Sequence, residues 1–330
     1  MKKYFFLFLI MSIFNNSVFA KIDEIIQAKF ANTNFSNIQT IDQLSDSIKN
    51  ISTDPKTELE LLLQWTDKYM SPDSLRFFKG GATLSINESI NKKIGLCDEY
   101  CNIVRSFCDK NGIKNIRIEG YVKEDTQNPS QKFEETNHAW NAVYIDSTWM
   151  LCDLFWSTCE VKKIDGKLMF NKRIDTIYYI HPPSVFISTH LPADPLFQFS
   201  MAPISIDEFT SGNTPSSIAN KFNYKDSLSK YLVMTSLEQV LQTAKNSYQF
   251  NKNNPNMLIA AYYNYAVDVY NNSKSKDVQL TKAIDYLNTA SNLIKISEIE
   301  SIQDLANPIL QARENLKLRL DFNKKHRISK

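Results

Sequence analysis

The chain has 330 residues, of which 43% are hydrophobic and 22% are charged, with a formal net charge of +2. This length is typical of two domains, and the apolar fraction is sufficient for a packed core. The near-neutral charge argues against a nucleic-acid partner, because phosphate binding requires a strongly basic face.

The first twenty residues, MKKYFFLFLIMSIFNNSVFA, have the layout of a secretory signal peptide. Lys2 and Lys3 precede an apolar run from Tyr4 to Phe14, and a cleavage point follows Ala20. The run is shorter than the roughly 20 residues that a membrane-spanning helix needs. We therefore expect residues 1–20 to be removed, which leaves a secreted or periplasmic protein without a membrane span.

The next strong pattern predicts a helix from Thr53 to Met70, with apolar residues at helical spacing. Asp54 is a typical N-cap, and Pro55 suits the first helical position because its missing N–H would have no partner there. A strand is predicted from Ile116 to Val122, and a polar loop from Asp125 to Thr136.

A second helix is predicted in the segment GLCDEYCNIVRSFCDKNGI. Cys97, Cys101, Val104 and Cys108 fall on one helical face, which we expect to pack on a sheet. Gly112 is a typical helix stop, since glycine tolerates the left-handed conformation.

Cys97 differs from the other cysteines because it lies in the first turn of this helix. Unpaired backbone N–H groups and the helix dipole favour an anion there, which makes Cys97 a candidate nucleophile. The adjacent Asp98 and Glu99 oppose a thiolate, so a nearby imidazolium would have to outweigh them.

The chain has five cysteines, so an oxidising compartment would leave one thiol unpaired. Core packing is the default for Cys101, Cys108 and Cys152. Bridges between Cys152 and Cys159 or between Cys101 and Cys152 are both compatible with the sequence. The spacings contain no C-x-x-C, and we expect neither a metal site nor a cofactor.

A hairpin is predicted in NHAWNAVYIDSTWMLCDLFW, residues 137–156. A two-residue turn at Asp146 and Ser147 makes Ile145 the partner of Thr148. With this register, His138 and Asp153 share one sheet face as diagonal neighbours. Such a pair is either a buried structural contact or the base and orienting carboxylate of a catalytic triad with Cys97.

The segment from Ile177 to Phe199 is aromatic and rich in proline, and is expected to be irregular. No glycine follows Gly212, which favours helices through Lys330. The last helix, from about Ile299 to Phe322, should bend or break near Pro308. We expect this region to have its own core, so that a chain ending near Phe209 keeps the fold of its first half.

The helical pair from Asn256 to Ile296 resembles a tetratricopeptide-type hairpin, although one pair is not a repeat array. It could serve as a helical cap or as a binding surface for a protein partner.

These residues resemble the transglutaminase-like superfamily of papain-type folds, in the branch related to the kyphoscoliosis peptidase. The cysteine segment matches its nucleophile helix at Cys97. The hairpin matches its histidine and aspartate strands at His138 and Asp153. Two flanking segments, ELELLLQWTDKYM and HPPSVFISTHLPADPLFQ, also resemble that branch. One departure is Leu154-Phe155-Trp156, where the superfamily often has x-Thr-Trp after the aspartate.

The resemblance implies an α+β fold, with a nucleophile helix packed on an antiparallel sheet, followed by an all-α helical module. We expect a signal peptide at 1–20, a transglutaminase-like domain at 21–210 and the helical module at 211–330. The implied activity is acyl transfer through a thioester on a peptide or protein substrate, either as a cysteine peptidase or amidase or as a crosslinker. Trp140 is a candidate substrate contact, although it could equally be a core residue. The alternative is an inactive binding or scaffold protein that uses its helical module.

Overall fold

The computed structural model describes the chain over five ranges: 24–123, 133–164, 167–212, 222–297 and 299–328. The expected signal peptide lies outside these ranges, as does most of the polar loop expected after residue 125. Every helix in the described ranges is too short or too polar to cross a lipid bilayer.

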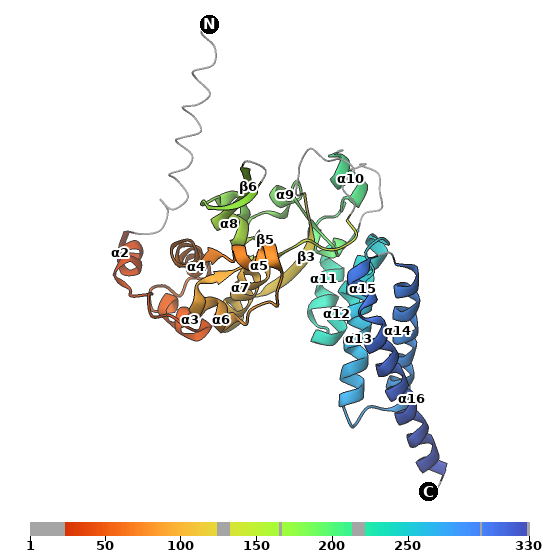
Figure 1. Cartoon of the computed structure of the whole chain (residues 1–330). Helices are drawn as coiled ribbons and strands as arrows, with labels where there is room; N and C mark the ends of the chain where they lie inside the picture. The colour runs from red at the N-terminus through yellow and green to blue at the C-terminus, as the bar shows by residue number, and fades with distance from the viewer. Residues whose placement is uncertain (1–23, 124–132, 165–166, 213–221, 298, 329–330) are drawn as a thin grey trace. The chain divides into compact units, whose positions relative to one another are not determined.

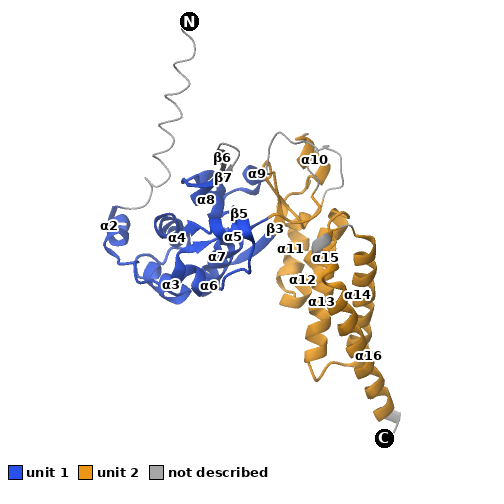
Figure 2. Cartoon of the chain, in the orientation of Figure 1, with its two compact units in different colours: residues 1–118, 138–186 blue, residues 119–137, 187–330 orange. Residues whose placement is uncertain are grey.

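The chain divides into two compact units, coloured separately in Figure 2. Unit 1 comprises residues 1–118 and 138–186, and unit 2 comprises residues 119–137 and 187–330. Residues 187–210 therefore lie in the same unit as the C-terminal helices, whereas the expected domain limit was 210. The domain limits remain a prediction that proteolysis of the folded protein would test.

Unit 1 combines helices and strands, in agreement with the α+β prediction. Helix α4 (Pro55–Tyr69) begins as expected, with the Asp54 carboxylate accepting the Thr57 N–H at 2.9 Å. Figure 1 labels most of these elements. The other helices of unit 1 are α2 (Glu24–Asn32), α3 (Ile41–Lys49), α5 (Ser74–Lys79), α6 (Ile86–Lys92), α7 (Cys97–Asn111), α8 (Leu154–Thr158), η2 (Thr176–Tyr178) and α9 (Pro183–Phe186).

The main sheet of unit 1 has the strand order β8-β5-β4-β3, and β3 continues into unit 2, where it pairs with β9. Strand β5 pairs with both β4 and β8, and β3 pairs with β9, in each case in the antiparallel direction. Two small sheets pair β1 with β2 and β6 with β7. The strands are β1 (Ser71–Pro72), β2 (Ile94–Gly95), β3 (Asn115–Val122), β4 (His138–Ile145), β5 (Thr148–Cys152), β6 (Cys159–Ile164), β7 (Lys167–Lys172), β8 (Tyr179–His181) and β9 (His190–Pro192).

The β4–β5 hairpin has the predicted turn and the predicted register. Ile145 pairs with Thr148, and the ladder continues to Asn141 and Cys152. Asp146 and Ser147 have φ angles of 50° and 61°. Positive φ at both central residues is the geometry that matches the twist of a two-residue hairpin.

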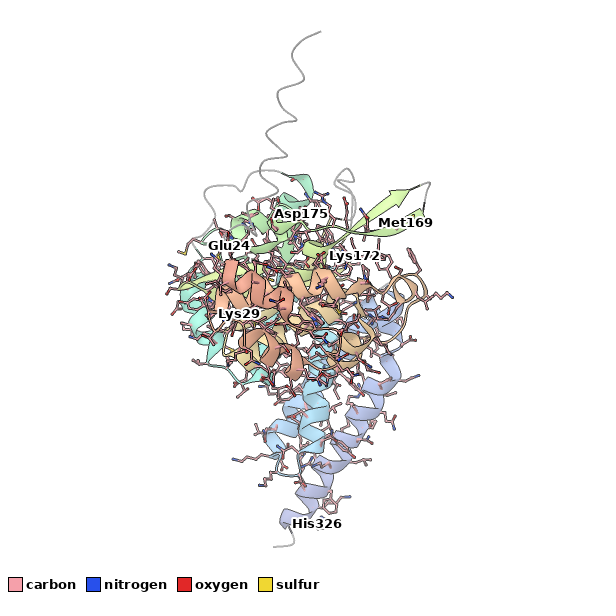
Figure 3. All side chains as sticks on the ribbon, turned by 90° about the vertical axis from the view of Figure 1, so that its left-hand side faces the viewer. Glu24, Lys29, Met169, Lys172, Asp175 and His326 are labelled. Carbon is pink, nitrogen blue, oxygen red and sulfur yellow. The ribbon has the colours of Figure 1, made fainter. Side chains whose placement is uncertain are left out.

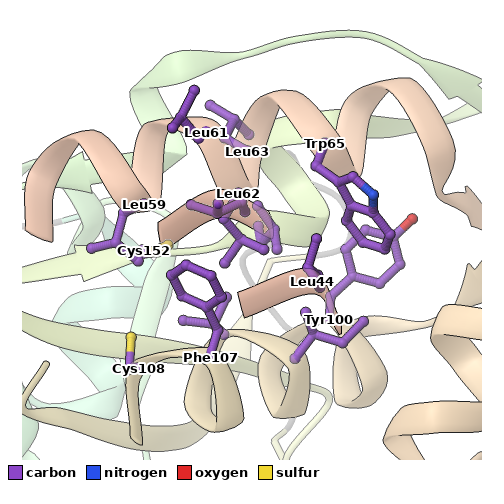
Figure 4. Packing of buried hydrophobic residues seen from close by; sticks show 14 of the residues in the cluster. Leu44, Leu59, Leu61, Leu62, Leu63, Trp65, Tyr100, Phe107, Cys108 and Cys152 are labelled. Carbon is purple, nitrogen blue, oxygen red and sulfur yellow. The ribbon is translucent and has the colours of Figure 1, made fainter. Parts of the chain in front are cut away.

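The core of unit 1 lies between α4 and α7, as the close view in Figure 4 shows. Leu62 and Trp65 of α4 are fully buried there, together with Phe107 and Cys108 of α7. Helix α7 ends where the sequence predicted, with Gly112 in the left-handed conformation at φ 72°. Burial of this face fixes the orientation of α7 and hence of the residues at its first turn.

Unit 2 is mainly helical after β9, as the absence of glycine predicted. The expected last helix is broken before Pro308, into α15 and α16. A single apolar cluster joins the helices from α12 to α16. The elements are η3 (Pro195–Gln198), α10 (Ile206–Ser211), α11 (Tyr224–Leu232), α12 (Ser236–Phe250), α13 (Asn256–Asn271), α14 (Asp277–Ile296), α15 (Glu300–Gln303) and α16 (Ala306–Ile328).

Candidate active site

Cys97 is the first residue of α7, and its side chain is half-buried. The preceding Leu96 is in an extended conformation and acts as the N-cap. The Leu96 N–H is donated to the carboxylate of Glu99 at 2.7 Å. The thiol therefore lies at the positive end of the helix dipole, as the sequence predicted.

The Glu99 carboxylate is buried and is held by four donors. Arg76 of α5 donates both terminal nitrogens to it, at 2.5 and 2.6 Å. The backbone N–H groups of Leu84 and Leu96 donate at 2.7 Å each. Burial raises the pKa of Glu99, but these hydrogen bonds outweigh burial and leave the pKa below its ordinary value. Glu99 is thus an ionised group whose charge is matched by an arginine.

Asp98 also pairs with an arginine. Its Oδ1 accepts from Nη2 of Arg117 on β3 at 2.7 Å, and Nη1 of Arg117 donates to Asn102 at 3.0 Å. The negative charges of both acidic residues that follow Cys97 are therefore offset by arginines. They destabilise a thiolate at Cys97 less than the sequence alone predicts. Neither Arg76 nor Arg117 was predicted from the sequence, because each contact joins elements that meet only in the folded protein.

His138 and Asp153 lie side by side, with Nε2 of the imidazole 2.5 Å from Oδ2 of the carboxylate. Both side chains are buried. The second carboxylate oxygen accepts the Trp156 N–H at 2.9 Å, because Asp153 is the N-cap of α8. The carboxylate is thereby fixed from both sides, and it holds the imidazole ring in one orientation.

One detail of the predicted hairpin is wrong. The pairing was expected to continue past Cys152, with Trp140 opposite Asp153 and His138 opposite Phe155. Instead, β5 ends at Cys152 and the chain turns into α8 at Leu154. The Asp153 carboxylate caps this helix, which favours helical rather than extended geometry for the residues after it.

The Cys97 side chain lies close enough to the His138 imidazole to help raise its pKa. Nε2 faces Asp153, so the other ring nitrogen, Nδ1, is directed away from that carboxylate. Burial lowers the pKa of His138, but the Asp153 carboxylate and Cys97 outweigh burial and raise the pKa to about 10. The structure thus brings the three predicted residues together in the order Cys97, His138, Asp153.

Aromatic rings surround the imidazole. Its centroid lies 5.5 Å from the Trp156 ring, 6.0 Å from the Trp140 ring and 6.4 Å from the Phe155 ring. Trp140 is 1% exposed, so in this structure it packs beside His138 within the core. A direct contact between Trp140 and substrate remains a prediction.

The other four cysteines are buried free thiols. Burial raises the pKa of Cys101, Cys108, Cys152 and Cys159. Neither bridge that the sequence left open is formed.

Comparison with known proteins identifies relatives of the part of the chain that contains this site. Residues 42–154 match the family model of the transglutaminase-like superfamily, and this range includes Cys97, His138 and Asp153. The chain is 32% identical to the kyphoscoliosis peptidase of Homo sapiens and 31% identical to that of Mus musculus, over 114 residues in each case. Each match covers 34% of this chain and 17% of the relative.

Among solved structures, one described as the crystal structure of a TGase is 12% identical, over 44% of this chain and 36% of that chain. Its TM-score of 0.27 is too low to bear on the fold. The family assignment depends instead on the matched residues 42–154 and on the relatives that align with them. The chain therefore carries a domain of the transglutaminase-like superfamily.

Proposed function

We propose that this protein is a thiol acyl-transfer enzyme that acts on peptide or amide bonds through Cys97, His138 and Asp153. The observation that carries the proposal is the position of the His138 imidazole, which has the Asp153 carboxylate 2.5 Å from Nε2 and the Cys97 side chain near enough to help raise its pKa. A nucleophile, a base and a group that orients the base are the parts that covalent catalysis requires.

In the proposed reaction, Nδ1 of His138 takes the Cys97 proton and Sγ attacks the carbonyl carbon of the substrate. The imidazolium returns the proton to the departing amine as the C–N bond breaks, which leaves a thioester on Cys97. Water or an amine then attacks the thioester and transfers its own proton to Nδ1. When the C–S bond breaks, the product acid or amide is released and Cys97 is restored.

The electrostatics of the site support this sequence of steps. The raised pKa of His138 favours an imidazolium, whose positive charge stabilises a neighbouring thiolate. Arg76 and Arg117 offset the charges of Glu99 and Asp98, so the imidazolium does not have to outweigh them alone. Asp153 fixes the tautomer that leaves Nδ1 free of a proton in the neutral ring.

The acceptor in the second step decides whether the enzyme is a peptidase or a crosslinker. The human and mouse relatives are named as peptidases, which favours water as the acceptor. We further propose that the protein is exported and loses residues 1–20, and the N-terminal sequence of the mature protein would test this.

The proposed nucleophile can be tested by mapping which cysteines iodoacetamide alkylates in the folded protein at about pH 6, where an ordinary thiol with a pKa near 8.5 is almost entirely protonated. Cys97 should react faster than the four buried cysteines. His138→Ala should remove most of this reactivity. Asp153→Asn should reduce it less, since asparagine can still cap α8 but lacks the charge that orients the ring.

Two outcomes would contradict the proposal: Cys97 labelling no faster than Cys159, or labelling that is unchanged in His138→Ala. Circular dichroism of each variant would show that the fold is intact. With either outcome, the inactive binding or scaffold protein becomes the better description of this chain.

A further inference from the structure

Helix α5 exposes an unusual amount of apolar surface for its six residues. Leu75 is 66% exposed, Phe77 44% and Phe78 56%. We call these three side chains the α5 patch. Contiguous exposed apolar side chains of this size commonly mark a binding surface.

The backbone ties α5 to the start of the nucleophile helix. Strand β1, which precedes α5, pairs with β2, which precedes Cys97, so that Ser71 is opposite Ile94 and Pro72 is opposite Gly95. Within α5 itself, Arg76 is bound to the buried Glu99, two residues after Cys97. Helix α5, which carries the patch, is therefore held to the residues on both sides of Cys97, by strand pairing before it and by an ion pair after it.

A line of aromatic rings connects the patch with the proposed base. The Phe77 ring lies edge-on to the Phe170 ring of β7, with centroids 5.0 Å apart, and Phe78 lies 6.4 Å from the same ring. Phe170 is 6.2 Å from Phe155, which is 6.4 Å from the His138 imidazole. Ring contacts thus run from the exposed side chains of α5 through the half-buried Phe170 and the buried Phe155 to the buried imidazole.

The β6–β7 hairpin adds to this surface. Val161 of β6 is paired with Phe170 and is itself exposed. Figure 3 shows Met169 and Lys172 on the same hairpin. Lys172 donates a hydrogen bond to the backbone carbonyl of Asp67 in α4, which anchors the hairpin to the helical part of unit 1.

We propose that the α5 patch binds a large apolar side chain of a peptide substrate, adjacent to the carbonyl that Cys97 attacks. This inference rests on the proposed function and gives it a substrate class: peptides with a residue such as phenylalanine or leucine next to the reactive carbonyl. Arg76, the cationic residue between the apolar side chains, is directed to Asp73 and Glu99. The patch therefore recognises apolar area rather than charge.

The test compares two acyl donors, the 4-nitrophenyl esters of N-acetyl-phenylalanine and N-acetyl-glycine. In each reaction Sγ replaces the phenolate, and the released 4-nitrophenolate is measured. The full-length protein should prefer the phenylalanine ester by roughly tenfold in kcat/KM, since binding of an apolar group gives discrimination of this order. Phe78→Ala should remove most of this preference and leave the rate with the glycine ester unchanged.

Three further variants make the test specific. Phe77→Ala should act as Phe78→Ala does, and having both protects the test if one variant folds poorly. Leu318→Ala, at a site of α16 that is 69% exposed, is the matched control and should change neither rate. Cys97→Ser should abolish both reactions.

The outcomes distinguish failure of the α5 patch as a specificity site from failure of the proposed function. If both esters react through Cys97 without a preference, or if the preference survives in both phenylalanine variants, the α5 patch is not the specificity site and the proposed function stands. If neither ester reacts in a manner that depends on Cys97, the proposed function fails and this inference fails with it.

Discussion

The two acidic residues after Cys97 are compensated in different environments. Glu99 is fully buried and bound by Arg76 through two nitrogens, whereas the Asp98 side chain is 44% exposed and bound by Arg117. A buried carboxylate that loses its partner is left as an uncompensated charge, but an exposed carboxylate is solvated by water. The two ion pairs should therefore contribute very differently to stability.

Arg76→Met should reduce the free energy of unfolding by about 3–5 kcal/mol, because Glu99 would remain buried without its cation. Arg117→Met should cost about 1 kcal/mol or less, because Asp98 is exposed. Denaturant unfolding of both variants measures the difference. Equal losses would show that the Glu99 site admits water or becomes protonated at little cost.

His138 should make the protein less stable as the pH rises above neutrality. Its pKa is raised from 6.5 to about 10 in the folded protein, despite burial, by Asp153 and Cys97. A raised pKa stabilises the fold fully below the unfolded value, and this contribution is lost as pH rises through the folded value. We expect the thermal midpoint to fall between about pH 6.5 and pH 10.

The variant His138→Gln isolates this effect, because buried tyrosines and cysteines also ionise on unfolding at alkaline pH. Thermal melts of both proteins across this interval should diverge, with the steeper decline in the unchanged protein. Parallel curves would mean that the imidazole does not carry the proton in the folded state.

The residues of the proposed triad could be predicted from the sequence because each lies in a local sequence pattern. Cys97 follows from the start of a periodic helix, and His138 with Asp153 follows from the two-residue period of a hairpin. Arg76 and Arg117 have no such signal: they lie 23 and 19 residues from their carboxylates, on different elements. Such contacts depend on tertiary packing, which a one-dimensional pattern does not contain.

At the scale of elements, the hairpin shows where local sequence pattern no longer predicts the secondary structure correctly. Turn length fixed the register from Ile145 to Asn141. Beyond Cys152, the bulky residues Leu154 to Trp156 read as strand, but Asp153 caps a helix there. The cap hydrogen bond to Trp156 outweighs the strand preference of these side chains.

The turn itself should be a site of stored strain. Ser147 has a φ of 61°, a conformation that costs a residue with a side chain about 1 kcal/mol relative to glycine. Ser147→Gly should therefore stabilise the protein by about that amount, less the entropy that glycine adds to the unfolded chain. Thermal melts are the measurement, with Ser147→Ala as the control that keeps the Cβ. A similar gain in both variants would mean that the serine hydroxyl, and not the backbone, is unfavourable.

At the scale of the whole molecule, each compact unit is built from two separate stretches of the chain, which the composition does not indicate. The loss of glycine after Gly212 correctly marks the start of a helical region, but unit 2 also contains residues 119–137. Asn251, at the end of α12, donates to the Tyr121 hydroxyl at 3.0 Å and to the Phe133 carbonyl at 2.6 Å. Phe209 packs in the same cluster as Tyr121 and Phe133. Composition detects helices, but it does not detect which earlier strand they cover.

The sequence predicts that a chain ending near Phe209 keeps the fold of its first half, and these contacts give that shortened chain a cost in stability. Removal of the later residues deletes the amide that satisfies the Phe133 carbonyl, and also that of Asn254, which donates to Tyr121 at 3.1 Å. A buried polar group left without a partner costs about 1–3 kcal/mol. We therefore expect a chain ending at Thr210 to unfold at lower denaturant concentration than the full chain, with residues 119–123 losing protection from hydrogen exchange first.

A point variant in the full chain separates this polar contact from the general loss of packing. Asn251→Ala should reduce the free energy of unfolding by about 1–3 kcal/mol, because both the Tyr121 hydroxyl and the Phe133 carbonyl lose a buried donor. Asn253→Ala, two residues away and exposed, is the matched control and should change stability by less than about 0.5 kcal/mol. If the two variants are equally stable, the amide of Asn251 does not hold the early segment in unit 2. The division of the chain near residue 210 then becomes the better account of its domains.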